Sequence, residues 1–209
     1  MEYLAPILGI SLIHILALMS PGPDFIMVIK NSLSYGRRST FFTALGLTFG
    51  IMVHITYCIL GIGLIISQSI ILFTVIKFIG AGYLIYIGIQ AFLAKKSGLQ
   101  IETETKKKEV SNLTFFKIGF LTNVLNPKAT LYFLSIFTLY ITPELPTWVI
   151  GTMSLSMVIL TFVWFFILGI FFTHAKIRNV FFTFETILNK VFGSVLVFLG
   201  IKIATSSHK

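Results

Sequence analysis

The sequence predicts an all-α, polytopic membrane protein of six transmembrane helices, arranged as two three-helix halves that form an inverted repeat. Three observations lead to this fold class. The 209-residue chain is 56% hydrophobic, and its mean hydropathy is +0.95. Only 11% of its residues are charged, against roughly 25% in soluble domains. Its apolar residues fall into segments long enough to cross a bilayer, and prolines interrupt the first and the fourth of these.

About 20 apolar residues form one helical crossing, which allows each span to be placed. The predicted spans cover residues 3–29, 40–65, 69–93, 114–140, 147–173 and 187–205. The one long polar tract lies within residues 95–113 and is the expected linker between a first half, 1–94, and a second half, 114–209. The whole chain, 1–209, is expected to form a single membrane domain.

Basic residues gather on alternate connections, which the positive-inside rule places in the cytoplasm. Lys30, Arg37 and Arg38 follow the first span, and Lys176 and Arg178 follow the fifth. The 95–113 linker is therefore expected to be cytoplasmic, with both termini outside. The net charge of +9 comes from basic residues between the spans, which we interpret as topology signals that contact the lipid bilayer. No nucleic-acid partner is expected.

The start of the chain gives no sign of a secretory signal peptide. It lacks a positively charged flank, and no small-residue cleavage site precedes Ser20. We therefore expect the first span to remain in the protein.

The two proline-containing breaks are expected at similar depths. Counted from the basic residues at the span ends, Pro21 and Pro127 lie roughly 15 Å deep, about half of the hydrocarbon core. Irregular backbone is tolerated there only when it is buried in protein or lines a wet cavity. Paired broken helices in an inverted repeat point to a transport site. We expect the breaks to meet and to bind the charged ends of a small zwitterion.

Asp24 is the only acidic residue well inside any predicted span, since Glu185 falls in the connection before the sixth. An ionised carboxylate at that depth costs a few kcal/mol, so it should be paired, protonated or occupied by a ligand. Lys128, directly after the second break, is the expected counter-ion. A role in proton coupling or substrate binding competes with two structural readings: a fixed Asp24–Lys128 pair, or Asp24 as a cap of the helix after Pro23.

Other polar and small residues have several readings. Asn123 and Asn126 lie on one helical face before the second break, where they could bind substrate or satisfy the broken turn. His14 and His54 are secondary polar sites, although a lone intramembrane histidine more often makes one interhelical hydrogen bond. Gly46-xxx-Gly50 permits close helix packing, either within the fold or across a homodimer.

Several function classes lack the residues they need. The single cysteine, Cys58, excludes an intramolecular disulfide and a multi-thiolate metal site, and no cofactor is expected. The sequence contains no hydrolase signature, so the protein is not expected to be an enzyme. Export of a metal ion, which would favour clustered Cys, His and carboxylates, or of another small solute remains an alternative. A nontransporting membrane scaffold is another, although it leaves the breaks and Asp24 unexplained.

Two stretches carry a resemblance to a known family. SPGPDFIMVIKNSLSYGRRSTFFTALGLTFG (20–50) and GFLTNVLNPKATLYF (119–133) resemble the lysine exporter and homoserine/threonine efflux (LysE/RhtB) family. The resemblance spans nearly the whole chain. It implies export of amino acids or close derivatives from the bacterial cytoplasmic membrane, driven by proton exchange. The family motifs fall on Pro21, Gly22, Pro23, Asp24, Asn123, Asn126, Pro127 and Lys128. These residues are the predicted substrate and proton path.

Overall fold

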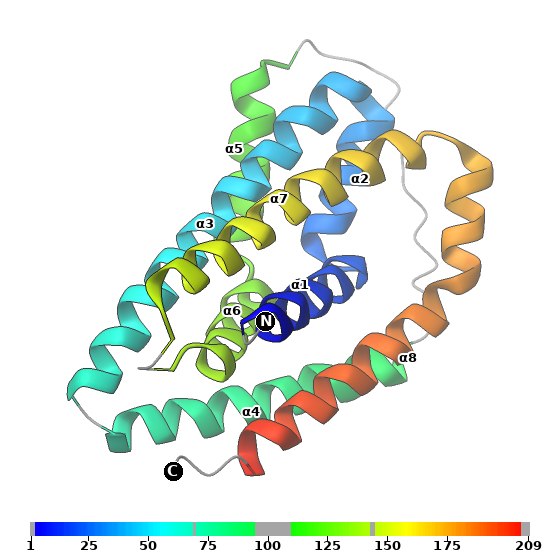
Figure 1. The fold of residues 1–209 in the computed structure, drawn as a ribbon. Coiled ribbons are helices and arrows are strands. Elements are labelled where there is room, and N and C mark those ends of the chain that lie inside the picture. Colours follow the sequence, from blue (N-terminus) through cyan, green and yellow to red (C-terminus); the bar gives the residue numbers. More distant parts are fainter. Residues whose placement is uncertain (1–2, 69, 95–109, 143–144, 206–209) are drawn as a thin grey trace.

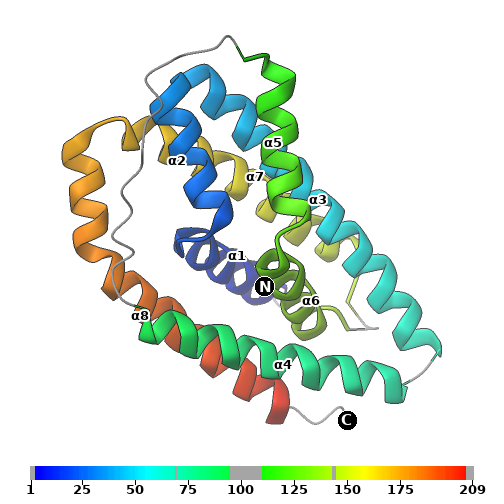
Figure 2. The ribbon, with the colours of Figure 1, turned by 180° about the vertical axis from the view of Figure 1, so that it is seen from behind.

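The computed structural model describes residues 3–68, 70–94, 110–142 and 145–205, which form eight α-helices (Figures 1 and 2). The helices are α1 (Leu4–Met19), α2 (Pro23–Tyr35), α3 (Arg37–Gln68), α4 (Ile70–Leu93), α5 (Asn112–Val124), α6 (Pro127–Tyr140), α7 (Thr147–Phe172) and α8 (Ala175–Thr205). Most of the predicted 95–113 linker lies outside the described residues.

Four helical segments of the described chain are long and apolar enough to cross a membrane alone: Arg37–Gly61, Thr74–Leu93, Thr147–Phe172 and Thr183–Thr205. Helices α1 and α2 meet the same test together, as a pair bent by 59°. The protein is therefore an all-helical, multi-pass membrane protein whose described residues contain four candidate spans, or five if the bent pair is one span. A sixth span would have to come from α5 and α6, and it stays a prediction.

Pro23 and Pro127 start new helices, and Pro21 lies in the break before α2, so none of the three kinks a continuous helix. Ser20, before Pro21, has extended backbone (φ −72°, ψ 120°), because proline disfavours a helical conformation in the preceding residue. Pro23 and Pro127 lie in the first turns of α2 and α6. A missing amide N–H costs nothing in the first turn, where it would have no partner in the helix.

Two helices extend well beyond the spans predicted from hydropathy. The first span was expected to end at residue 29, and α2 continues to Tyr35, so Lys30 lies inside a helix. The sixth was expected to begin at residue 187, and α8 begins at Ala175. In both places the helix continues through polar residues, which a hydropathy criterion leaves out. Gly36 (φ +78°) ends α2 in a conformation that favours glycine, and α3 follows directly.

The helices form two groups with a short pair between them. Helices α4 and α8 cross along one side of the molecule, and α2, α3, α5 and α7 gather on the other, with α1 and α6 between them (Figure 1). The most extensive contacts join α4 to α8 and α3 to α5. Two buried apolar clusters stabilise the arrangement. The larger includes α1 and α6, and the smaller joins α2 to α3 and α7. Because α1 and α2 pack into different clusters, the bend between them is fixed.

Gly46 and Gly50 are used within the chain. A Cβ atom added at Gly46 would overlap the carbonyl oxygen of Phe116 on α5, and one at Gly50 would lie 2.7 Å from the Cβ of Asn123. Backbone-to-backbone packing of this kind needs glycine. The motif therefore explains the contact of α3 with α5 and gives no support to a homodimer, which stays a prediction.

Replacing Gly46 by alanine should destabilise the fold, because the backbone of α5 must move to admit the new methyl group. We expect a loss of about 1–3 kcal/mol, as for other overpacked interiors, visible as a lower thermal unfolding midpoint in detergent. Gly61→Ala is the matched control on the same helix, since nothing lies within 4 Å of its added Cβ. Equal midpoints for the two variants would contradict the close α3–α5 packing.

Candidate functional site

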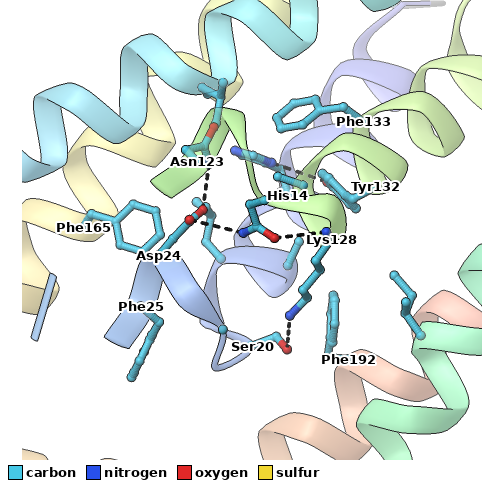
Figure 3. Close-up of a pocket in the computed structure, with 17 residues that line it drawn as sticks. His14, Ser20, Asp24, Phe25, Asn123, Lys128, Tyr132, Phe133, Phe165 and Phe192 are labelled. Atoms are coloured by element: carbon cyan, nitrogen blue, oxygen red, sulfur yellow. Dashed lines mark hydrogen bonds between the residues drawn. The ribbon is translucent and has the colours of Figure 1, made fainter. Parts of the chain in front are cut away.

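The two breaks meet at a small cavity near the centre of the bundle (Figure 3). Ser20 and Gly22 line it from the first break and Asn126 from the second, and every described helix contributes at least one lining residue. Its volume is about 60 Å³, room for a few water molecules, since one needs roughly 10–15 Å³. We refer to it as the Asp24 cavity.

Asp24 is bound by the two asparagines that flank the second break. Its Oδ2 accepts a hydrogen bond from the Asn123 side-chain amide at 2.7 Å, and its Oδ1 accepts one from the Asn126 amide at 3.2 Å. Asp24 lies in the first turn of α2, where the positive end of the helix favours a carboxylate. It does not cap that helix, because the N-cap is Gly22 and both carboxylate oxygens accept from asparagines.

Lys128 does not act as the direct counter-ion of Asp24. Figure 3 shows its ammonium group directed toward Ser20 and Phe192. It donates a hydrogen bond to Ser20 Oγ at 2.9 Å, and it lies 5.4 Å from the ring centroid of Phe192. The fixed Asp24–Lys128 pair is therefore not formed, because Asn123 and Asn126 occupy the carboxylate and Lys128 points elsewhere. Both charged side chains nevertheless line the same cavity.

Asn126 has two roles at the second break. It is the N-cap of α6, where its side-chain oxygen accepts a hydrogen bond from the Lys128 backbone N–H at 3.0 Å. Its side-chain nitrogen donates to Asp24. One residue thus starts α6 and binds the carboxylate of the opposite break.

The two intramembrane histidines have different places. His14 lines the cavity, with its Nε2 2.8 Å from Thr161 Oγ1 on α7 and its Nδ1 3.4 Å from the Tyr132 hydroxyl on α6. His54 lies one layer further out, with its Nε2 3.0 Å from the backbone oxygen of Asn123. Both therefore join helices, and His54 contributes to the site by positioning Asn123.

Residues that could hold a metal ion do not gather in the part of the chain that the structure describes, where no three of His, Cys, Asp and Glu lie together. The donors around Asp24 are amides, hydroxyls and one ammonium group. The metal-export alternative therefore gains nothing from the site.

The order of motifs, the two breaks and the buried site agree with a sequence comparison over nearly the whole chain. The family described as LysE type translocator matches residues 15–207. The chain belongs to the LysE-type translocator family. This is a family of transporters, so the protein is a membrane translocator and not an enzyme.

Relatives of this LysE-type translocator include bacterial efflux proteins. It is 33% identical over 174 residues to the threonine efflux protein of Escherichia coli K12, covering 82% of this chain and 84% of the relative. It is 32% identical over 201 residues to the uncharacterized membrane protein YrhP of Bacillus subtilis 168, covering 89% and 92%. The threonine efflux protein of Salmonella typhi is 33% identical over 172 residues, covering 81% and 83%. No solved structure matches.

Sequence reasoning did not identify a second buried acidic residue of the translocator, which lies near the start of a candidate span. Glu185 is buried within the candidate span Thr183–Thr205, whereas the sequence placed it in a connection. Asn189, one turn later on the same face of α8, is buried as well. The four-residue spacing of the two polar residues was the available signal. The contacts of Ser20 with Lys128 and of His14 with Thr161 had none, since each pair is more than 100 residues apart.

Substitutions at Asn126 should separate its two roles. Serine can still cap α6 but is too short to bind Asp24, whereas alanine loses both functions. We expect both variants to lose transport together with the hydrogen bond to Asp24. Asn126→Ser should be about 1 kcal/mol more stable than Asn126→Ala, because it keeps the cap, and thermal unfolding in detergent would measure the difference. If the two variants unfold at the same temperature, the capping role is wrong.

Proposed function

We propose that this translocator exports amino acids or close derivatives across the bacterial cytoplasmic membrane in exchange for protons, through the site between its two broken helices. The observation that carries the proposal is the binding of Asp24, on α2, by Asn123 and Asn126 at the opposite break. Threonine is the first substrate to test, because relatives carry the name threonine efflux protein.

Asp24 is the proton carrier in this proposal. An ionised carboxylate only accepts hydrogen bonds, whereas a protonated one also donates. In the ionised form both oxygens accept from asparagine amides; a proton on one oxygen opposes the amide that donates there. Proton binding therefore weakens the link between the two breaks, and proton release restores it. The link is a two-state element of the kind that coupled transport requires.

The proposed architecture is an inverted repeat with six spans. Each half contains two short helices around a break and then two long helices: α1 to α4 over residues 4–93 and α5 to α8 over residues 112–205. Helices α4 and α8, which end the two halves, pack against each other. Three crossings per half reverse the second half relative to the first. In this arrangement the 95–113 linker is cytoplasmic and both termini are outside, as the basic residues favour.

Neutralising Asp24 should uncouple transport. Asp24→Asn keeps the size of the side chain, replaces one acceptor oxygen by an NH2 donor and removes the titration. We expect proteoliposomes preloaded with radiolabelled threonine to lose the efflux that an imposed pH gradient drives in wild type. Wild-type flux in a well-inserted Asp24→Asn variant would remove Asp24 from the mechanism.

A control for this experiment is available on α5. Lys117 is exposed, and Lys117→Met removes a charge outside the site. We expect it to keep gradient-driven efflux. If it loses flux as Asp24→Asn does, general damage to the protein would explain both results.

The six-span topology has its own test. Reporter fusions within the 95–113 linker should report the cytoplasm, and a fusion after Lys209 should report the outer side. A cytoplasmic C-terminus would mean that the number of crossings is odd, and it would contradict the inverted repeat.

A further inference from the structure

The Asp24 cavity is too small for an amino acid. Its volume of about 60 Å³ is far below the roughly 300–1,000 Å³ of ordinary ligand pockets. A second cavity, of about 440 Å³, adjoins it and falls within that range. The two cavities share Ser20 and Gly22 of the first break, together with Lys128. We refer to the second one as the larger cavity.

The larger cavity is bounded by one acidic and one basic side chain, Glu185 and Lys128, among the described residues that line it. Glu185 is only 1% exposed, and Asn189, one turn further along α8, is 4% exposed. Charged side chains at membrane depth are costly, and they commonly mark substrate pathways. Helix α4, which packs against α8, adds polar groups to the lining from Tyr83, Tyr86 and Gln90.

The position of Lys128 favours an anionic ligand. It lies in the first turn of α6, where the positive end of the helix disfavours a cation unless an anion is near. Its ammonium group donates a hydrogen bond to the neutral hydroxyl of Ser20. Both oxygens of Asp24 accept hydrogen bonds from the two asparagines instead. A ligand carboxylate at Lys128 would supply a directly bonded anion, which Asp24 does not.

We propose that the larger cavity binds the exported amino acid as a zwitterion, with its α-carboxylate on Lys128 and its α-ammonium on Glu185. This inference rests on the proposed function and deepens it. The Asp24 cavity then carries water and protons only. Substrate and proton occupy adjoining cavities, and Lys128, which lines both, transmits the presence of one to the other. One cation and one anion match a molecule that carries both α-charges, and they select against ligands that lack either.

The test is equilibrium binding of radiolabelled threonine to the purified full-length protein without a gradient. N-acetyl-threonine, which lacks the ammonium, and threoninol, which lacks the carboxylate, serve as competitors. Wild type should bind threonine at least about tenfold more tightly than either analogue. In Glu185→Gln, threonine binding should weaken by roughly 30-fold, as for loss of one partner of a buried charge pair. N-acetyl-threonine should then bind as well as threonine, a change that mere structural damage would not produce.

Lys190→Gln is the matched control, because it alters charge at an exposed position of the same helix. It should leave both affinities unchanged. Unaltered threonine affinity and selectivity in folded Glu185→Gln would overturn the inference. If wild type neither binds nor exports any amino acid, the proposed function itself fails. If wild type exports threonine while Glu185→Gln retains full selectivity, only the assignment of the larger cavity fails.

A second measurement does not need a Glu185 variant to fold. Cys58 is the only cysteine, so a Cys58→Ser background allows single cysteines to be placed in either cavity. Ala91 lines the larger cavity and Ala17 the Asp24 cavity. Saturating threonine should slow modification of Ala91→Cys by a thiol reagent, and N-acetyl-threonine should not. Absence of protection at Ala91→Cys, or protection confined to Ala17→Cys, would contradict the proposal.

Discussion

The hydrogen bonds of Asp24 with Asn123 and Asn126 are the interaction on which the rest of the site depends. They join residues about 100 positions apart and link α2 to both helices of the second break. Burying a carboxylate at membrane depth is costly unless it accepts hydrogen bonds of this kind. Their presence explains how the Asp24 carboxylate is accommodated inside the bundle.

Close packing of α3 against α5 supports the hydrogen bond between Asn123 and Asp24. Gly46 lets α3 approach the backbone of α5, and Gly50 leaves room for Asn123. His54, from the same helix α3, donates a hydrogen bond from its Nε2 to the backbone oxygen of Asn123. One helix therefore fixes the height and the orientation of the asparagine that binds Asp24. A change in the α3–α5 contact would displace Asn123 and so alter its hydrogen bond with the Asp24 carboxylate, although neither glycine touches that carboxylate.

Asp24 and Lys128 do not bind each other directly. Asp24 is bound by amides, and Lys128 by a hydroxyl and an aromatic face. A directly paired Asp24 and Lys128 would neutralise each other and leave little for a substrate or a proton to change. Separated charges next to a cavity can respond to a ligand, because its charged ends alter the balance of each group.

The sequence by itself determined the membrane class, the positions of both breaks and the residues at them, because hydropathy, prolines and charged residues at depth are local signals. It also predicted that Asp24 and the two asparagines matter. The tertiary structure decided what pairs with what. Lys128 binds Ser20 and not Asp24, and the Gly46 motif packs within the chain. Glu185, expected in a connection, lies on a buried face of a helix. Such outcomes depend on contacts between helices far apart in sequence, which no local pattern encodes.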